Sequence, residues 1–158
     1  MKLAHTIKLS VFVNEGESEP LVLGRIKELL PVDFELEKIH IEKRTVEGLH
    51  GNKIIILELN IDKEKHTTLF IETLVGKLSQ QQKELLLRQA ESRLDEDLNF
   101  FMRLDKDKLL EKNEYFITQS GNCFHLKMHI ASFPAKRQNA MEVLRGFLGK
   151  TISSQQLF

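Results

Sequence analysis

The chain has 158 residues, of which 41% are hydrophobic and 29% are charged, and its 23 basic side chains balance 23 acidic ones. These values are typical of a globular chain that buries a core of its own, so they exclude an intrinsically disordered protein. The zero net charge argues mildly against a nucleic-acid-binding protein, although a neutral chain can still gather its basic groups on one face.

The first part of the chain predicts a strand, a helix and then a hairpin of two strands. Residues 5–13 alternate between apolar and polar side chains, as a half-buried strand does. Ser18 followed by Pro20 is typical of a helix start. Strands are predicted over residues 34–44 and 53–61, and the glycine-rich link between them favours an antiparallel hairpin.

The second part of the chain predicts two consecutive helices, three strands and a last helix. Apolar residues recur at helical spacing after Asp62 and again after Ser79. The predicted strands cover residues 98–104, 115–118 and 123–131, and a short charged helical turn or loop covers 105–112. Pro134 opens the last helix, and we expect residues 151–158 to form a flexible tail.

This order, β-α-β-β-α-α-β-(α)-β-β-α, places the strands in runs that helices separate. It predicts a single α+β domain over residues 1–150, in which an antiparallel or mixed sheet has helices packed on one face. The other face of the sheet is then open. The side chains expected on this open face are Thr6, Lys8, Ser10, Phe101, Arg103, His125, Lys127 and His129.

An open sheet face of this composition suits a nucleic acid, because basic and hydroxyl groups hold phosphates and an aromatic ring stacks on a base. A solvated face and a face buried in a dimer are the alternatives. A second basic group, formed by Lys136, Arg137 and Arg145, falls on the last helix. Lys136 and Arg137 lie in its first turn, where backbone amides already favour an anion.

Catalytic and metal-binding patterns find little support. His125 and His129 share a strand face, but Lys127 lies between them, and a cation is unfavourable among metal ligands. Cys123 and His125 could form a nucleophilic pair, yet no third group marks an orienting residue or an oxyanion hole. The carboxylates that follow Arg93 alternate with basic residues, which favours an ion-paired surface. We therefore expect a non-catalytic protein with no cofactor and no metal.

The sequence also predicts a cytoplasmic protein without membrane contact. Cys123 is the single cysteine, so no internal disulfide forms, as is usual in a reducing compartment. Residues 1–5 lead directly into the first strand and do not resemble a signal peptide. The longest apolar run, residues 54–57, is far shorter than the roughly 20 residues that span a bilayer.

Two blocks of the sequence resemble the archaeal exosome-subunit-like family of RNA-binding proteins. The first block is Arg93-Leu94-Asp95-Glu96-Asp97 followed by Phe101-Met102-Arg103-Leu104-Asp105-Lys106, and the second runs from Phe124 to Arg137. The opening strand with His5 and the leucine-rich first helix also fit, so the resemblance extends over residues 3–148. It implies a non-catalytic, RNA-associated protein whose fold is similar to that of the ribosomal protein that binds 5S RNA.

The open face and the resemblance together define a set of RNA-binding candidates. Lys8 and Lys127 come from the open face, and the resemblance adds the rest. The full set is Lys8, Arg93, Arg103, Lys106, Lys127, Lys136 and Arg137. We expect five residues, Arg103, Lys106, Lys127, Lys136 and Arg137, to converge on one positive surface. The protein is expected to act, with protein partners, in RNA processing or ribosome-related assembly. The alternative is a protein-interaction module whose exposed sheet face binds a second copy or a larger assembly, and it predicts apolar residues outside the core, for example Phe12 or Phe101.

Overall fold

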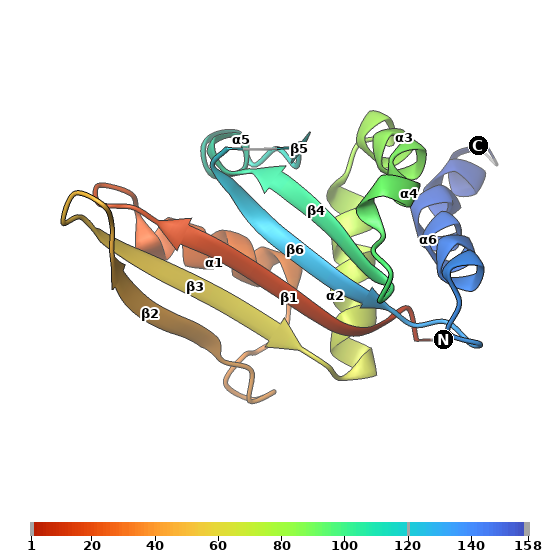
Figure 1. The fold of residues 1–158 in the computed structure, drawn as a ribbon, viewed down its shortest axis with the longest axis horizontal. Helices are drawn as coiled ribbons and strands as arrows, with labels where there is room; N and C mark the ends of the chain where they lie inside the picture. The colour runs from red at the N-terminus through yellow and green to blue at the C-terminus, as the bar shows by residue number, and fades with distance from the viewer. Residues whose placement is uncertain (1, 120, 157–158) are drawn as a thin grey trace.

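This computed structural model describes residues 2–119 and 121–156, with only the backbone described over 150–156, and they form a sheet accompanied by helices (Figure 1). The strands are β1 (Ala4–Val13), β2 (Ile41–Glu47), β3 (Lys53–Ile61), β4 (Asn99–Asp105), β5 (Ile117–Thr118) and β6 (Cys123–Ile130). The helices are α1 (Glu19–Leu29), α2 (Glu64–Lys77), α3 (Gln80–Arg88), α4 (Ala90–Arg93), α5 (Lys106–Lys112) and α6 (Arg137–Gln156).

The strands form one antiparallel sheet in the order β2-β3-β1-β6-β4-β5. The predicted α+β class is therefore confirmed, and the predicted element order matches except for the additional short helix α4. The first strand, β1, lies in the middle of the sheet between β3 and β6. Segments from both ends of the chain thus meet at the centre, which brings the side chains of β1, β6 and β4 next to one another.

Strict alternation in the central strands separates a core face from an open face. In β1, Ile7, Leu9 and Val11 are buried, whereas Lys8 between them is exposed. Removing such aliphatic side chains from water stabilises the fold by roughly 1.5–3 kcal/mol each. Figure 1 shows α1 and α2 behind the sheet and the opposite face uncovered toward the viewer. The prediction that helices pack on one face is confirmed.

The prediction of a strand over residues 34–44 is wrong at its start, because β2 begins only at Ile41. A local turn replaces the expected pairing. The Asp33 carboxylate accepts the Leu36 amide at 3.0 Å, and the Ile39 amide donates to the Phe34 carbonyl at 2.8 Å. Phe34 and Ile39 are half-buried against the core, so their apolar spacing reflects this turn and not a sheet.

The end of the chain is helical over most of the segment for which we expected a flexible tail. The backbone of α6 continues to Gln156, inside the segment 151–158. Residues 157–158 lie outside the described part of the chain. Among the helices that the structure describes, none combines the length and the apolar character needed to cross a membrane.

Candidate nucleic-acid interface

The open face carries two adjacent rows of side chains that cross the sheet from β4 through β6 to β1. In the first row, Phe101 pairs with Lys127, and Lys127 pairs with Lys8. Lys127 is exposed, and the Lys8 side chain keeps 49% of its surface in solvent. The Lys8 ammonium lies 3.6 Å from the Glu58 carboxylate of β3. An exposed ion pair of this kind is weak, so Lys8 remains able to bind an anion.

In the second row, Arg103 of β4 pairs with His125 of β6, which pairs with Ser10 of β1. The Arg103 guanidinium donates a hydrogen bond to the Gln119 carbonyl at 2.7 Å, which holds the side chain in place, and Arg103 lines the groove described below. Burial, and then the charge of Arg103, lower the pKa of His125, so its imidazole is neutral near neutral pH. This row therefore presents a cation, a neutral ring and a hydroxyl.

Arg93, at the end of α4, borders the same face. Its guanidinium donates to the Gln89 side-chain oxygen at 2.7 and 2.9 Å and to the Phe101 carbonyl at 3.3 Å. Burial, and then the charge of Arg103, lower the pKa of Arg93. The two guanidinium groups are thus close enough to repel each other, and a bound anion would relieve that repulsion.

These side chains line one groove of about 560 Å³. Four of the predicted RNA-binding residues belong to it, namely Lys8, Arg93, Arg103 and Lys127. Phe12, Phe101 and Ser92 also line the groove. Phe12 and Ser92 were not among the predicted RNA-binding residues. The signal for Phe12 was present in the sequence, because the alternation of β1 places it on the face of Lys8 and Ser10.

Lys106, in contrast, does not lie on this surface, which corrects the prediction that it joins the other candidates. The residue is fully buried at the start of α5. Its ammonium contacts the Glu17 carboxylate at 2.7 Å, the Phe12 carbonyl, and the Asn122 side-chain oxygen at 3.4 Å. These hydrogen bonds compensate the cost of burying the ammonium. Lys106 therefore links the loop after β1 to α5, and its buried side chain cannot reach a ligand on the surface.

The two basic residues at the start of the last helix also lie away from the groove. The Arg137 guanidinium donates to the carbonyls of Leu94 at 2.8 Å, Asp95 at 3.4 Å and Glu91. It therefore caps the end of α4, where carbonyls lack helical partners. Lys136 is exposed but does not line the groove. Of the five residues expected to converge on one positive surface, Arg103 and Lys127 line the groove, whereas Lys106, Lys136 and Arg137 do not.

The acidic residues near Arg93 hold turns together. The Asp95 carboxylate accepts the amides of Asp97 and Asn99, each at 2.9 Å. The Asp105 carboxylate caps α5 by accepting the Lys108 amide at 2.9 Å. The carboxylates of Asp95 and Asp105 are therefore engaged in backbone structure, as side chains of this type often are at turns and helix starts.

Cys123 and His125 lie close together, with 3.4 Å between the Sγ and Nε2 atoms. Cys123 is buried, and this burial raises the pKa of its thiol, which disfavours the thiolate that a nucleophile needs. Within residues 2–119 and 121–149, no cluster of His, Cys, Asp and Glu side chains has the arrangement of a metal site. The geometry of the face suits binding more than bond-breaking chemistry.

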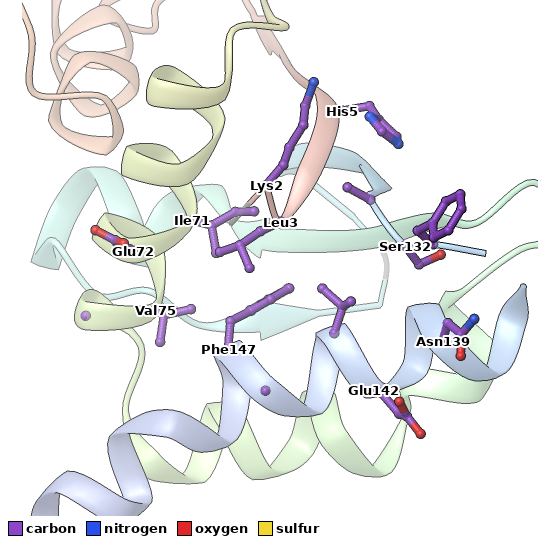
Figure 2. A pocket seen from close by; sticks show the side chains of 15 residues that line it. Lys2, Leu3, His5, Ile71, Glu72, Val75, Ser132, Asn139, Glu142 and Phe147 are labelled. Atoms are coloured by element: carbon purple, nitrogen blue, oxygen red, sulfur yellow. The ribbon is translucent and has the colours of Figure 1, made fainter. Parts of the chain in front are cut away.

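A larger groove of about 1200 Å³ lies between α2 and α6. Figure 2 shows Ile71 and Val75 of α2 and Phe147 of α6 around this space, with Leu3 beside them. Its lining is mainly apolar and includes Lys2 and His5 as well as the acids Glu72 and Glu142. In this groove the carboxylates offset the charge of Lys2, whereas four cations and no carboxylate line the groove on the open face. A phosphate backbone is attracted by the second arrangement, so the open sheet face is the candidate interface.

Comparisons with known proteins show the family to which the chain belongs. A family model described as RNA binding matches residues 6–130. The protein named RNA-binding protein PAB1135 from Pyrococcus abyssi is 27% identical over 145 residues, covering 92% of this chain and 94% of its own. The uncharacterized protein MJ0213 from Methanocaldococcus jannaschii is 32% identical over 112 residues, covering 67% of this chain and 71% of its own.

Solved structures show the same fold. The structure of Mth689, a DUF54 protein from Methanothermobacter thermautotrophicus, aligns with a TM-score of 0.72 and 29% identity, over 92% of this chain and 98% of that chain. The residues that the family model matches begin in β1 and end with β6, so they include all the strands of the open face. The protein therefore belongs to this RNA-binding family, which has archaeal members.

Proposed function

We propose that this protein binds RNA through the open face of its sheet and acts in the cytoplasm as a non-catalytic accessory of RNA processing or ribosome-related assembly. The observation that carries this proposal is one groove lined by four cations and two exposed phenylalanines, namely Lys8, Arg93, Arg103, Lys127, Phe12 and Phe101. Lysine and arginine bind phosphates, and an exposed ring stacks on a base.

The zero net charge of the chain is compatible with this proposal, because the four cations come together on one face. Electrostatic attraction of a polyanion depends on the local field of such a cluster more than on the total charge. The name of the Pyrococcus relative, RNA-binding protein, supports the same function.

The same cations argue against self-association through this face. In a symmetric dimer one patch meets its own copy, so Lys8 and Lys127 of one chain would face the same cations of the other. Like charges brought together at an interface are costly. RNA, which carries the opposite charge, is the partner that this surface fits better.

The proposal predicts RNA binding that weakens steeply with salt. Each phosphate contact on a single strand lowers the slope of log K against log salt by roughly 0.7, so four contacts predict a slope of about −3. Fluorescence anisotropy with a labelled RNA over a range of potassium chloride concentrations measures this slope. Absence of RNA binding at low salt, or an affinity that does not change with salt, would contradict the proposed function.

A further inference from the structure

We infer that the RNA bound on this face is single-stranded and that its bases stack on Phe12 and Phe101. This inference rests on the proposed function and specifies its substrate class. Phosphate contacts alone do not distinguish a single strand from a duplex. The distinction comes from the two phenylalanine rings that line the same groove as the four cations.

Both rings are exposed on strands whose other large apolar side chains are mostly buried. Phe12 keeps 49% of its surface in solvent and Phe101 keeps 42%, whereas Phe100 and Phe124 are fully buried. Phe12 follows Ser10 by two residues in β1, and Phe101 precedes Arg103 by two residues in β4. Side chains two residues apart share a strand face, so both rings lie on the open face and contribute little to the core.

The two rings lie far enough apart to contact different nucleotides. Phe101 is level with Lys8, and Phe12 lies four residues further along β1. The two strands that carry the rings, β4 and β1, are separated by β6, so the rings lie roughly 10 Å apart across the sheet. The offset of four residues along β1 adds roughly 13 Å in the direction of the strands. Arg103 and His125 lie between the two levels. A strand that crosses the face diagonally would therefore place its phosphates near Arg103 while its bases reach the rings.

A duplex cannot use these features. In double-stranded RNA the faces of the bases are stacked on one another, and proteins contact the backbone and the minor groove instead. Unstacked bases of a single strand expose both faces to an aromatic side chain. The groove volume of about 560 Å³ also falls in the range of small-ligand pockets. A base or a nucleotide therefore fits within it.

The test compares one labelled RNA as a single strand and as a duplex, with the wild-type chain and with Phe12→Ala and Phe101→Ala. We expect the wild type to favour the single strand, and each substitution to weaken single-strand binding roughly 5- to 150-fold. The salt slope should stay unchanged, because no charge is removed. Phe101→Trp should retain binding, since a tryptophan ring also stacks.

Phe133→Ala is the matched control, because Phe133 is 97% exposed and lies outside this groove. Thermal melts of all variants establish that the fold is intact. Equal affinity of the wild type for single strand and duplex would overturn the inference, and so would unchanged binding by both alanine variants, while RNA binding itself would stand. Absence of binding to either RNA would refute the proposed function and the inference with it.

Discussion

Lys106→Ala is expected to lower the free energy of unfolding by about 3 kcal/mol, the low end of the range for a broken buried ion pair. The substitution leaves the Glu17 carboxylate and the Phe12 carbonyl without the ammonium that joins them. It also removes the buried methylenes of a side chain with 0% exposure. The Glu17 side chain keeps 24% of its surface in solvent, so water compensates part of the loss.

Urea unfolding at neutral pH measures this change, and Lys127→Ala is the control. Lys127 is exposed on the open face, so its replacement should change stability by no more than about 0.5 kcal/mol. An Lys106→Ala protein that keeps its stability but loses RNA binding would contradict our placement of Lys106 and return it to the RNA-binding residues.

The Lys106–Glu17 contact also gives a pH dependence. Burial alone would raise the pKa of Glu17, but hydrogen bonds from Lys106 and from the Asn14 amide hold it below its usual value. A carboxyl with a lowered pKa in the folded state stabilises the fold above its unfolded pKa. This contribution is therefore present at neutral pH and is lost as the pH falls through the lowered pKa of Glu17. In Lys106→Ala the free energy of unfolding should therefore fall less between neutral and acidic pH than it does in the wild type.

The double charge reversal Lys8→Glu with Lys127→Glu is expected to weaken RNA binding roughly 100-fold at about 0.1 M salt, because two phosphate contacts are lost and two repulsions replace them. The two residues pair in register across β1 and β6, so the reversal changes the centre of the open face. Anisotropy titration measures the loss. Both side chains lie on the exposed face, so the fold should be retained.

Lys63→Glu with Lys112→Glu is the matched control. Lys63 and Lys112 are exposed and lie outside the groove, so this variant has the same net charge as the first. If total charge governed binding, the two double variants would bind RNA equally weakly. Our account requires the control to stay close to the wild type, and equal losses in both would count against a localised site.

The sequence predicted the open face well because a strand alternates its side chains with a period of two. Once β1, β4 and β6 were recognised, the exposed positions of Lys8, Arg103 and Lys127 followed from their neighbours. The family resemblance added Arg93, whose guanidinium borders the same groove. Most of the charged side chains of the open face could therefore be predicted before the order of the strands was known.

The remaining candidates could not be placed from the sequence, because their partners are distant along the chain. Lys106 is separated from Glu17 by 89 residues, and nothing near it in the sequence indicates burial. Arg137 donates to the carbonyls of Leu94, Asp95 and Glu91, which precede it in the sequence by 43, 42 and 46 residues. Local sequence patterns show which face of its own helix or strand a side chain occupies. The residues of other elements that pack against that face are known only from the tertiary fold.

The most direct test of the RNA-binding face is a titration of the ¹⁵N-labelled chain with single-stranded RNA, followed by NMR. We predict that the largest amide shifts map to the residues that line the groove, namely Lys8, Ser10 and Phe12 of β1, Phe101–Arg103 of β4 and His125–Lys127 of β6. Amides beside the larger groove between α2 and α6 should stay in place. Shifts concentrated along α2 and α6, with the central strands unaffected, would contradict the account.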